Sequence, residues 1–441
     1  MNILILNGSP KGSSSITLQT CLYLQKHFPE HSWKVLHVGQ KINQIECDFG
    51  EAVDDLRVAD LLLFCYPVYT FLAPSQLHRF VELMKEHQNA GVLDLRGKWA
   101  TQVTTSKHFY DVTAHRFIEE NSKDMGLHVL PGLSADMEDF LSEKGRGDAY
   151  HFFDYIMFQI CRETADPAQV PVPKTKNNHF TIAIVADMAS DDTQLQQMVD
   201  LFRHQVSYKC KLVNIHDFPF KGGCISCFHC SADGTCIYND GFDTLLRNEI
   251  QSCDATVYAF TIKDHSMGSR FKMYDDRQFC NGHRTVTMGK PVGYLVNGAY
   301  HVESNLQMVL EGRANVGGNY LCGVAETELM EDPVHRIMSV EQLAVRMDYA
   351  LDGLYTQPAN FFGVGGMKIF RDLIYQMRGL MRADHRFFKQ HGQYDFPQKQ
   401  WRTSLKMYLV GVLMNNKKMQ TKMGSKMSEG MLKPYRDALE K

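Results

Sequence analysis

The sequence predicts an α/β protein with two tandem, doubly wound parallel sheets and a C-terminal helical region. Apolar runs without alternation recur between helical patterns, as expected for parallel strands covered on both faces. The whole series occurs twice, offset by about 180 residues, which indicates an internal duplication. The chain has 441 residues, too many for one core. We therefore expect a first domain over 1–163, a linker over 164–179, a second domain over 180–330 and helices over 331–441.

Composition excludes several classes of protein. The formal net charge of −3 gives no reason to expect a nucleic-acid partner. The N-terminus MNILILNGSP enters an apolar strand directly, without the basic segment or cleavage site of a signal peptide. No apolar run is long enough for a transmembrane span. Twelve cysteines in a chain without an export signal indicate the reducing cytoplasm, so we expect a cytoplasmic protein.

The first domain alternates strands with helices. The predicted strands are Asn2–Leu6, Trp33–Val38, Ala59–Cys65, Trp99–Thr105 and His128–Leu133. The predicted helices are Leu18–His27, Pro74–Lys85 and Val112–Met125. A further aromatic-rich helix is expected over Tyr150–Cys161, before the linker. This spacing is typical of an α/β unit.

The loop NGSPKGSSSIT between the first strand and the first helix has the composition of an anion site. Backbone N–H groups at a helix start and the hydroxyls of Ser9, Ser15 and Thr17 can bind a phosphate. The loop matches neither G-x-x-x-x-G-K-[ST] nor G-x-G-x-x-G, which argues against a nucleoside triphosphate or a dinucleotide fold. Neutral hydroxyls suit the phosphate of flavin mononucleotide (FMN). The alternative is a solvated Ser-rich loop with a serine N-cap.

The third strand leads into CYPVYTFLAPSQLHRFVELM. In open α/β sheets, ligands bind at the carboxyl ends of strands, so Pro67–Phe71 should lie beside the phosphate loop. The aromatic rings would then form an apolar wall, although packing under the next helix is an alternative. Thr104, Thr105 and Ser106, at the end of the fourth strand, would complete the pocket.

NGSPKGSSSIT followed by YPVYTFLAPSQLHRFVE resembles the flavodoxin-like NAD(P)H-dependent FMN reductases over roughly residues 1 to 135. Pro74 and Leu77 match the start of that family's helix, whereas Ile16, His78 and Glu82 depart from its usual Asn, Lys and Asp. The residues expected to bind the cofactor are Ser9, Lys11, Ser15, Ile16, Thr17, Pro67, Val68, Tyr69, Thr70, Phe71, Thr104 and Thr105. The sequence identifies no catalytic residue.

The second domain repeats the series. The predicted strands are Phe180–Asp187, Lys211–Ile215, Ala255–Ile262, Pro291–Val296 and Tyr320–Ala325. The predicted helices are Asp192–Gln205, Phe242–Ile250, Ser269–Phe279 and Ser304–Ala314. The loop after its first strand is ADMASDDTQ, whose Asp187, Asp191 and Asp192 would repel a phosphate. We therefore expect no flavin in this copy.

Between the second strand and second helix of this copy lies GCISCFHCSADGTCIYND. Its cysteines, Cys224, Cys227, Cys230 and Cys236, follow the pattern C-x2-C-x2-C-x5-C. Consecutive two-residue gaps suit a cubane iron–sulfur cluster best. Structural zinc usually takes two separated C-x2-C pairs and is second; disulfides suit the compartment least. The run resembles that of the iron–sulfur flavoproteins of the same superfamily, and the resemblance implies a [4Fe-4S] cluster on these four thiols.

The last hundred residues are less informative. An amphipathic helix is expected from Ser339, and GVGG at residues 363–366 is expected to be a loop before another helix. From Phe361 to the end, sixteen Lys and Arg stand against six Asp and Glu, which usually indicates a solvated face. An acidic protein partner or a lipid surface is the alternative.

Together these patterns predict an NAD(P)H-dependent FMN oxidoreductase that passes electrons to an organic acceptor or through an iron–sulfur cluster. One alternative is a non-catalytic electron-transfer protein that works with a ferredoxin-like partner. Another is a zinc-stabilised flavodoxin-like binding module. The sequence leaves open the acceptor, the choice between NADH and NADPH, and whether the chain forms a homo-oligomer.

Overall fold

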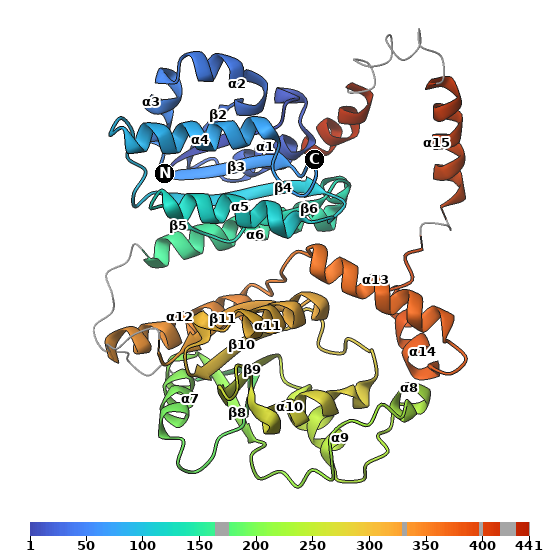
Figure 1. The fold of residues 1–441 in the computed structure, drawn as a ribbon. Coiled ribbons are helices and arrows are strands. Elements are labelled where there is room, and N and C mark those ends of the chain that lie inside the picture. Colours follow the sequence, from blue (N-terminus) through green and yellow to red (C-terminus); the bar gives the residue numbers. More distant parts are fainter. Residues whose placement is uncertain (164–175, 329–332, 397–399, 415–428, 441) are drawn as a thin grey trace. The chain divides into compact units, whose positions relative to one another are not determined.

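The computed structural model describes residues 1–163, 176–328, 333–396, 400–414 and 429–440. The chain divides into two compact units (Figure 1). The first contains Met1–Asp166, Pro358–Phe361 and Phe396–Lys441; the second contains Pro167–Gln357 and Phe362–Asp395. Most of the predicted linker, residues 164–175, lies outside the described residues, and the strand that follows already begins at Asn177.

The first unit is a parallel sheet in the order β2-β1-β3-β4-β5, with β6 also paired to β4. Its strands are β1 (Asn2–Asn7), β2 (Ser32–Leu36), β3 (Leu61–Pro67), β4 (Trp99–Ser106), β5 (His128–Val129) and β6 (Leu133–Asp136). Its helices are α1 (Ile16–His27), α2 (Val38–Cys47), α3 (Gly50–Val58), α4 (Ser75–Asn89), α5 (Asp111–Asp124) and α6 (Glu143–Glu163). The predicted strand His128–Leu133 is divided into two, because Pro131 has no N–H to donate to a ladder.

Both faces of this sheet are covered, which explains the unbroken apolar runs. On β3, Leu62 and Phe64 pack into one core cluster, together with residues of α2, α3 and α4. Leu61 and Leu63 pack into the opposite cluster, with residues of α1 and α6. A helix over residues 429–439 joins this second cluster through Tyr435. Alternate residues of a strand thus serve two different cores.

The second unit repeats this topology, in the order β11-β10-β9-β7-β8. Its strands are β7 (Asn177–Ala186), β8 (Tyr208–Asn214), β9 (Ala255–Thr261), β10 (Pro291–Asn297) and β11 (Tyr320–Glu326). Its helices are α7 (Thr193–Gln205), α8 (His229–Asp233), α9 (Phe242–Leu245), α10 (Gly268–Arg277), α11 (Ser304–Gly317) and α12 (Pro333–Asp352), and a single π-helical turn, Leu246–Ile250, continues α9. The fold class predicted from the sequence is confirmed: two flavodoxin-like parallel sheets, followed by C-terminal helices.

The loops of the two copies share backbone geometry even where their sequences differ. After the third strand of the first unit, Tyr69 and Leu72 exchange two backbone hydrogen bonds (2.8 and 3.1 Å) around a turn with positive φ at both central residues. Lys263 and Ser266 do the same in the second unit (2.9 and 3.0 Å). Two central residues with positive φ are typical of a tight turn between antiparallel partners. The duplication therefore extends into loops that have no residue in common.

The C-terminal region contains α13 (Phe361–Gln376), α14 (Arg382–Gln390) and α15 (Trp401–Met414). The expectation of a loop at GVGG is wrong, because these residues lie inside α13. A Cβ on Gly366 would stand 2.7 Å from a methyl of Val316 in α11, so the glycine allows the two helices to approach closely. No helix in the part of the chain that the structure describes is long and apolar enough to cross a membrane.

Candidate functional site

A cavity of about 310 Å³, here called the first cavity, lies in the first unit where β1, β3 and β4 end. Its lining comes from four segments that are separate in the sequence. The residues are Ser9, Lys11, Ser15, Ile16, Thr17, Pro67, Val68, Tyr69, Thr70, Phe71, Thr105, Ser106, Lys107, Phe109 and Met137. This is the end of an open parallel sheet at which ligands bind. Eleven of the twelve residues expected to bind the cofactor are in this lining.

Thr104 is the expected residue that the structure places outside the first cavity. Its hydroxyl is fully buried and lies 2.8 Å from Nε2 of His115 in α5. The neighbouring Thr105 faces the opposite way and lines the cavity. Burial lowers the pKa of His115 to about 4, so the ring is neutral at pH 7. Thr104 therefore belongs to the packing beneath the site.

The loop after β1 is fixed by hydrogen bonds from buried side chains. The Asn7 amide donates to the Gly12 carbonyl (2.9 Å), and its oxygen accepts from the Ser9 N–H (3.2 Å). Gly12 has φ of +53°, a conformation that glycine adopts without strain. Ser15 is the N-cap of α1, and its Oγ accepts from the Leu18 N–H (3.4 Å). This preorganised helix start presents further backbone N–H groups to the cavity.

Hydroxyl groups form the floor of the first cavity. Thr17 Oγ1 lies 2.6 Å from Thr105 Oγ1, and this pair joins α1 to the end of β4. Both side chains are almost completely buried. Apart from Lys11 and Lys107 the lining carries no charged side chain, and Lys107 is paired with Asp136 (2.7 Å). The cavity is thus suited to bind an anion through neutral donors.

Aromatic side chains form the outer wall. Tyr69 and Phe71 are 44% and 42% exposed, which leaves their rings accessible from solvent. Phe71 contacts Phe109, with ring centroids 5.4 Å apart, and Tyr110, at 4.7 Å. The sequence analysis missed Lys107, Phe109 and Met137, because their position depends on how the β4–α5 and β6 loops fold back. The only sequence signal for them was their place after a strand end.

A buried carboxylate supports the β4–α5 loop. Asp111 accepts hydrogen bonds from Ser134 and from His108, whose Nδ1 lies 3.0 Å away. Burial alone would raise the pKa of Asp111, but these bonds together hold it below its ordinary value. His108 is also fixed by its backbone N–H, which donates to Ser106 Oγ (2.8 Å). The loop that carries Phe109 is therefore anchored on both sides.

The corresponding helix start in the second unit is closed by a carboxylate. Asp192 is the N-cap of α7 and accepts from the Leu195 N–H (3.2 Å). It also accepts from Asn297 Nδ2 (3.2 Å) and from the Thr261 hydroxyl, at the ends of β10 and β9. The donors that would meet an anion are already used by the protein itself. The expectation of no flavin in this copy stays a prediction.

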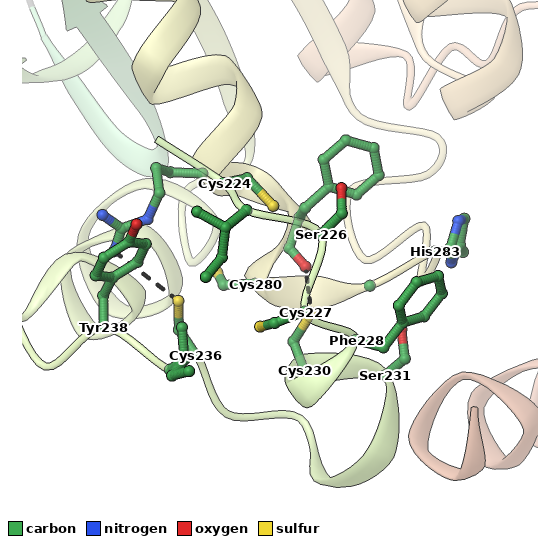
Figure 2. A pocket seen from close by; sticks show the side chains of 15 residues that line it. Cys224, Ser226, Cys227, Phe228, Cys230, Ser231, Cys236, Tyr238, Cys280 and His283 are labelled. Carbon is green, nitrogen blue, oxygen red and sulfur yellow. Dashed lines mark hydrogen bonds between the residues drawn. The ribbon is translucent and has the colours of Figure 1, made fainter. Parts of the chain in front are cut away.

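A second cavity, of about 210 Å³, is surrounded by cysteines (Figure 2). Its lining includes the four predicted ligands and a fifth thiol, Cys280, which the sequence analysis had assigned to no site. Ser226 and Phe228, between the first three cysteines, adopt positive φ and bend the backbone sharply. All twelve cysteines of the chain are free thiols. In the described residues, no three His, Cys, Asp or Glu side chains are placed to hold a single metal ion.

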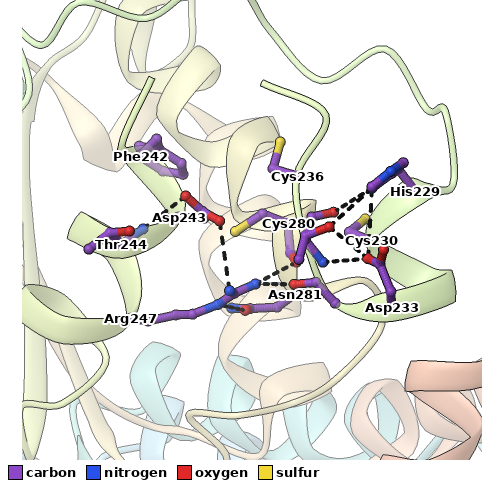
Figure 3. A network of polar contacts seen from close by, with 12 residues as sticks. His229, Cys230, Asp233, Cys236, Phe242, Asp243, Thr244, Arg247, Cys280 and Asn281 are labelled. Carbon is purple, nitrogen blue, oxygen red and sulfur yellow. Dashed lines mark hydrogen bonds and ion pairs between the residues drawn. The ribbon is translucent and has the colours of Figure 1, made fainter. Parts of the chain in front are cut away.

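Arginines fix the walls of this cysteine cavity. Arg247 donates to the carbonyl of Cys280 (3.1 Å) and lies 3.8 Å from Asp243 (Figure 3). Arg284 also donates to the Cys280 carbonyl (3.3 Å). Arg277 lies within the lining, with Nη2 3.9 Å from Sγ of Cys236. One buried and two partly buried cations beside several thiols favour a ligand set that carries negative charge.

Comparison with known proteins supports this architecture. Residues 1–130 match a family described as having a flavodoxin-like fold. An iron-sulfur flavoprotein from Archaeoglobus fulgidus is 27% identical over 176 residues, which cover 38% of this chain and 78% of that protein. The predicted resemblance to this superfamily is therefore confirmed, and the two sheets fit a tandem duplication of its fold.

Solved structures with this fold also align with the chain. An FMN-dependent NADH-azoreductase from Bacillus anthracis, in complex with FMN, is 12% identical and has a TM-score of 0.28; the match covers 36% of this chain and 98% of that one. A WrbA-like flavodoxin from Agrobacterium tumefaciens is 14% identical, with a TM-score of 0.28 and coverage of 37% and 99%. General stress protein 14 from Treponema denticola, in complex with FMN, is 16% identical, with a TM-score of 0.27 and coverage of 36% and 98%.

Proposed function

We propose that this protein is an NAD(P)H-dependent flavin oxidoreductase that holds FMN in the first cavity and a [4Fe-4S] cluster on Cys224, Cys227, Cys230 and Cys236. The observation that carries the proposal is the convergence of eleven expected residues, from three strand ends, on one cavity. Its volume of about 310 Å³ is within the range of small-molecule sites. The family match over residues 1–130 supports the same assignment.

The lining of the first cavity fits the two chemical parts of FMN. The start of α1 and the hydroxyls of Ser15 and Thr17 would bind the phosphate. The Tyr69–Phe71 turn and Phe109 would contact the apolar ring system. FMN, when bound, supplies an acceptor for hydride and a donor of one or two electrons. The protein's part is to orient the ring and to shield its buried edge from water.

The nicotinamide donor would bind at the exposed outer wall. Tyr69 and Phe71 present partly exposed rings there, and a planar nicotinamide can stack against such a surface. The same opening would admit an organic acceptor after the nicotinamide leaves. We infer that the nicotinamide binds first and is released before the acceptor binds, both at the same opening, because the outer wall is the accessible side of the cavity.

The cysteine cavity fits an iron–sulfur cluster by its donor set. Four thiols with the expected spacing line one hollow, and a buried N–H of Arg277 lacks a hydrogen-bond partner there. Cluster sulfurs accept such bonds. The cluster, when bound, would supply one-electron transfer, and a ferredoxin-like protein is the partner proposed for it. The cytoplasm is the compartment in which such exposed thiols stay reduced.

Two other functions remain as competing proposals. A protein that only carries electrons would hold both cofactors but would not oxidise NAD(P)H in repeated turnovers. A zinc-stabilised binding module would hold zinc at the same cysteines and would be colourless there. Steady-state NADH and NADPH oxidation with ferricyanide as acceptor separates the first alternative from an enzyme. Metal analysis separates the second.

The flavin assignment is tested with Ser15→Ala combined with Thr17→Ala, and with Thr104→Val as the matched control. The double variant removes two hydroxyls of the first cavity, and the lost helix cap costs about 1 kcal/mol of stability. We expect it to purify without FMN, whereas Thr104→Val keeps FMN because Thr104 faces His115. Full flavin retention by a folded double variant would refute the site. Flavin is measured by absorbance after release from denatured protein.

A further inference from the structure

One arginine of the cysteine cavity is buried far more deeply than its charge would suggest. Arg277 is the last residue of α10, and its side chain is 1% exposed. A buried cation is tolerated when it is paired and hydrogen-bonded. Its partners therefore show what this charge does in the fold.

All polar partners of Arg277 belong to the cysteine loop between β8 and α9. The guanidinium forms a two-fold pair with Asp240, with both N–O distances 2.8 Å, and Nη1 also donates to the Gly222 carbonyl (2.9 Å). Its Nη2 approaches Sγ of Cys236 at 3.9 Å. Hydrogen bonds from Arg277 lower the pKa of Asp240 to about 2, so the pair stays ionised in neutral solution. Arg277 thus ties together both ends of the loop that carries the cysteines.

Aromatic rings hold the guanidinium in place. Its carbon lies 4.5 Å from the ring centre of Tyr238 and 5.1 Å from that of Phe242. Tyr238 lines the cysteine cavity, and Phe242 starts the following helix. Such packing fixes the plane of the guanidinium, so its donors have fixed directions.

One donor of this fixed group is left over. Nε of Arg277 is buried and has no hydrogen-bond partner among the residues that the structure describes, whereas the other two nitrogens donate to Asp240 and Gly222. An unpaired buried N–H is costly, so a native protein keeps one where a further acceptor is expected. Arg247 and Arg284, in contrast, donate to backbone carbonyls of the cavity wall.

We propose that Arg277 is a positioning residue for the cluster, and that its guanidinium raises the cluster's reduction potential through two donors: Nη2, which approaches the sulfur of Cys236, and the buried Nε–H, which is left to donate to a further sulfur. This inference rests on the proposed function of the four cysteines. Reduction adds negative charge to a cluster, and a buried positive donor beside a ligand sulfur stabilises that charge. Asp240 opposes the effect because its carboxylate partly neutralises the guanidinium. The Arg277–Asp240 pair therefore sets the potential through two opposed contributions.

The test measures the midpoint potential of the cluster in the full-length protein by anaerobic titration, with iron and sulfide counted per chain. Arg277→Gln is expected to shift the potential to more negative values, and Arg277→Lys to shift it less. Asp240→Asn is expected to shift it in the positive direction, since the guanidinium then lacks its carboxylate. Arg284→Gln is the matched control: it removes a neighbouring cation that donates to backbone carbonyls, and its shift should be smaller than that of Arg277→Gln.

If the midpoint potential shifts in opposite directions in Arg277→Gln and Asp240→Asn, the pair tunes the potential. A merely structural role would instead lower the iron and sulfide content in both variants, without opposite shifts of the potential. Equal potentials in wild type, Arg277→Lys and Asp240→Asn would overturn the inference, even if Arg277→Gln fails to fold. If wild-type protein binds no iron, the proposed function itself fails. If the cluster is present but its potential does not change when Arg277 is replaced, only this inference fails.

Discussion

The N-termini of α1 and α7 are the same structural position in two copies of one fold. Ser15 caps α1 and Asp192 caps α7, and each side chain accepts from the backbone N–H three residues later. Behind them, Thr17 meets Thr105 in the first copy, while Asp192 meets Asn297 in the second. The backbone arrangement is kept, and the charge of the cap differs.

This difference shows how a helix start of one fold can be completed in two ways, with a neutral cap or with a charged one. A carboxylate at a helix start interacts favourably with the helix dipole and satisfies its N–H groups. It therefore stabilises the start of α7 for the same reason that a phosphate would bind at the start of α1. The cysteine loop, which the second copy carries after β8, gives that unit a separate cavity lined by thiols.

The largest expected effect comes from giving the first copy the cap of the second. Ser15→Asp should reduce FMN affinity by about 4 kcal/mol, roughly a thousandfold, because a carboxylate would stand near a phosphate about 4 Å away. Ser15→Asn is the matched control, since asparagine caps a helix as well as aspartate without the charge. Flavin fluorescence titration of deflavinated protein measures both. Equal affinities in the two variants would show that the phosphate does not bind at α1.

Replacing the cysteines one at a time shows which of them bind iron. Cys227→Ser should remove nearly all iron, because a cubane cluster uses four thiolates. Cys280→Ser should leave the iron content unchanged, although Cys280 lines the same cavity. FMN content should stay at the wild-type level in both. Iron loss in the Cys280 variant alone would assign the ligands differently from the spacing.

A smaller effect concerns acid stability of the first unit. The pKa of His115 falls to about 4 through burial, against 6.5 for an exposed histidine, so the unfolded chain binds the proton more readily. Stability should be fully present above pH 6.5 and should decline by about 3 kcal/mol as pH falls to 4. Urea unfolding at several pH values measures the slope. His115→Gln should flatten this slope, and an unchanged slope would contradict a neutral His115 in the folded protein.

The smallest effect is expected for one hydroxyl of the cavity floor. Thr105→Val should weaken FMN binding about tenfold, the value of one hydrogen bond to a charged group. Thr104→Val should leave the affinity unchanged, because its hydroxyl serves His115. The two substitutions are at adjacent positions and make the same chemical change. A similar loss of FMN affinity in both variants would mean that the fold of β4, and not the Thr105 hydroxyl, determines FMN binding.

The sequence was sufficient for the fold but not for every contact. Apolar runs located all five strand regions of each unit, whereas α2 and α3 were not predicted. Thr104 and Thr105 could not be separated, since a strand buried on both faces shows no alternation to reveal which side chain faces a ligand. Gly363 to Gly366 were expected to form a loop before a helix, but they lie inside α13, where Gly366 packs closely against Val316.

The candidate sites were predictable to the extent that they follow from local patterns. The hydroxyl loop, the aromatic turn and the four cysteines each form one short stretch of sequence. Phe109, Met137 and Arg277 reach these sites through tertiary structure, and nothing in their local sequence marks them. Cys280 was assigned to no site for the same reason.

The central claim is a division of labour in which each copy holds a different cofactor. The most direct measurement is the content of FMN, iron, sulfide and zinc per full-length chain after anaerobic purification. The account predicts one FMN, four iron and four sulfide, with no zinc. Two FMN per chain, or zinc in place of iron, would contradict it.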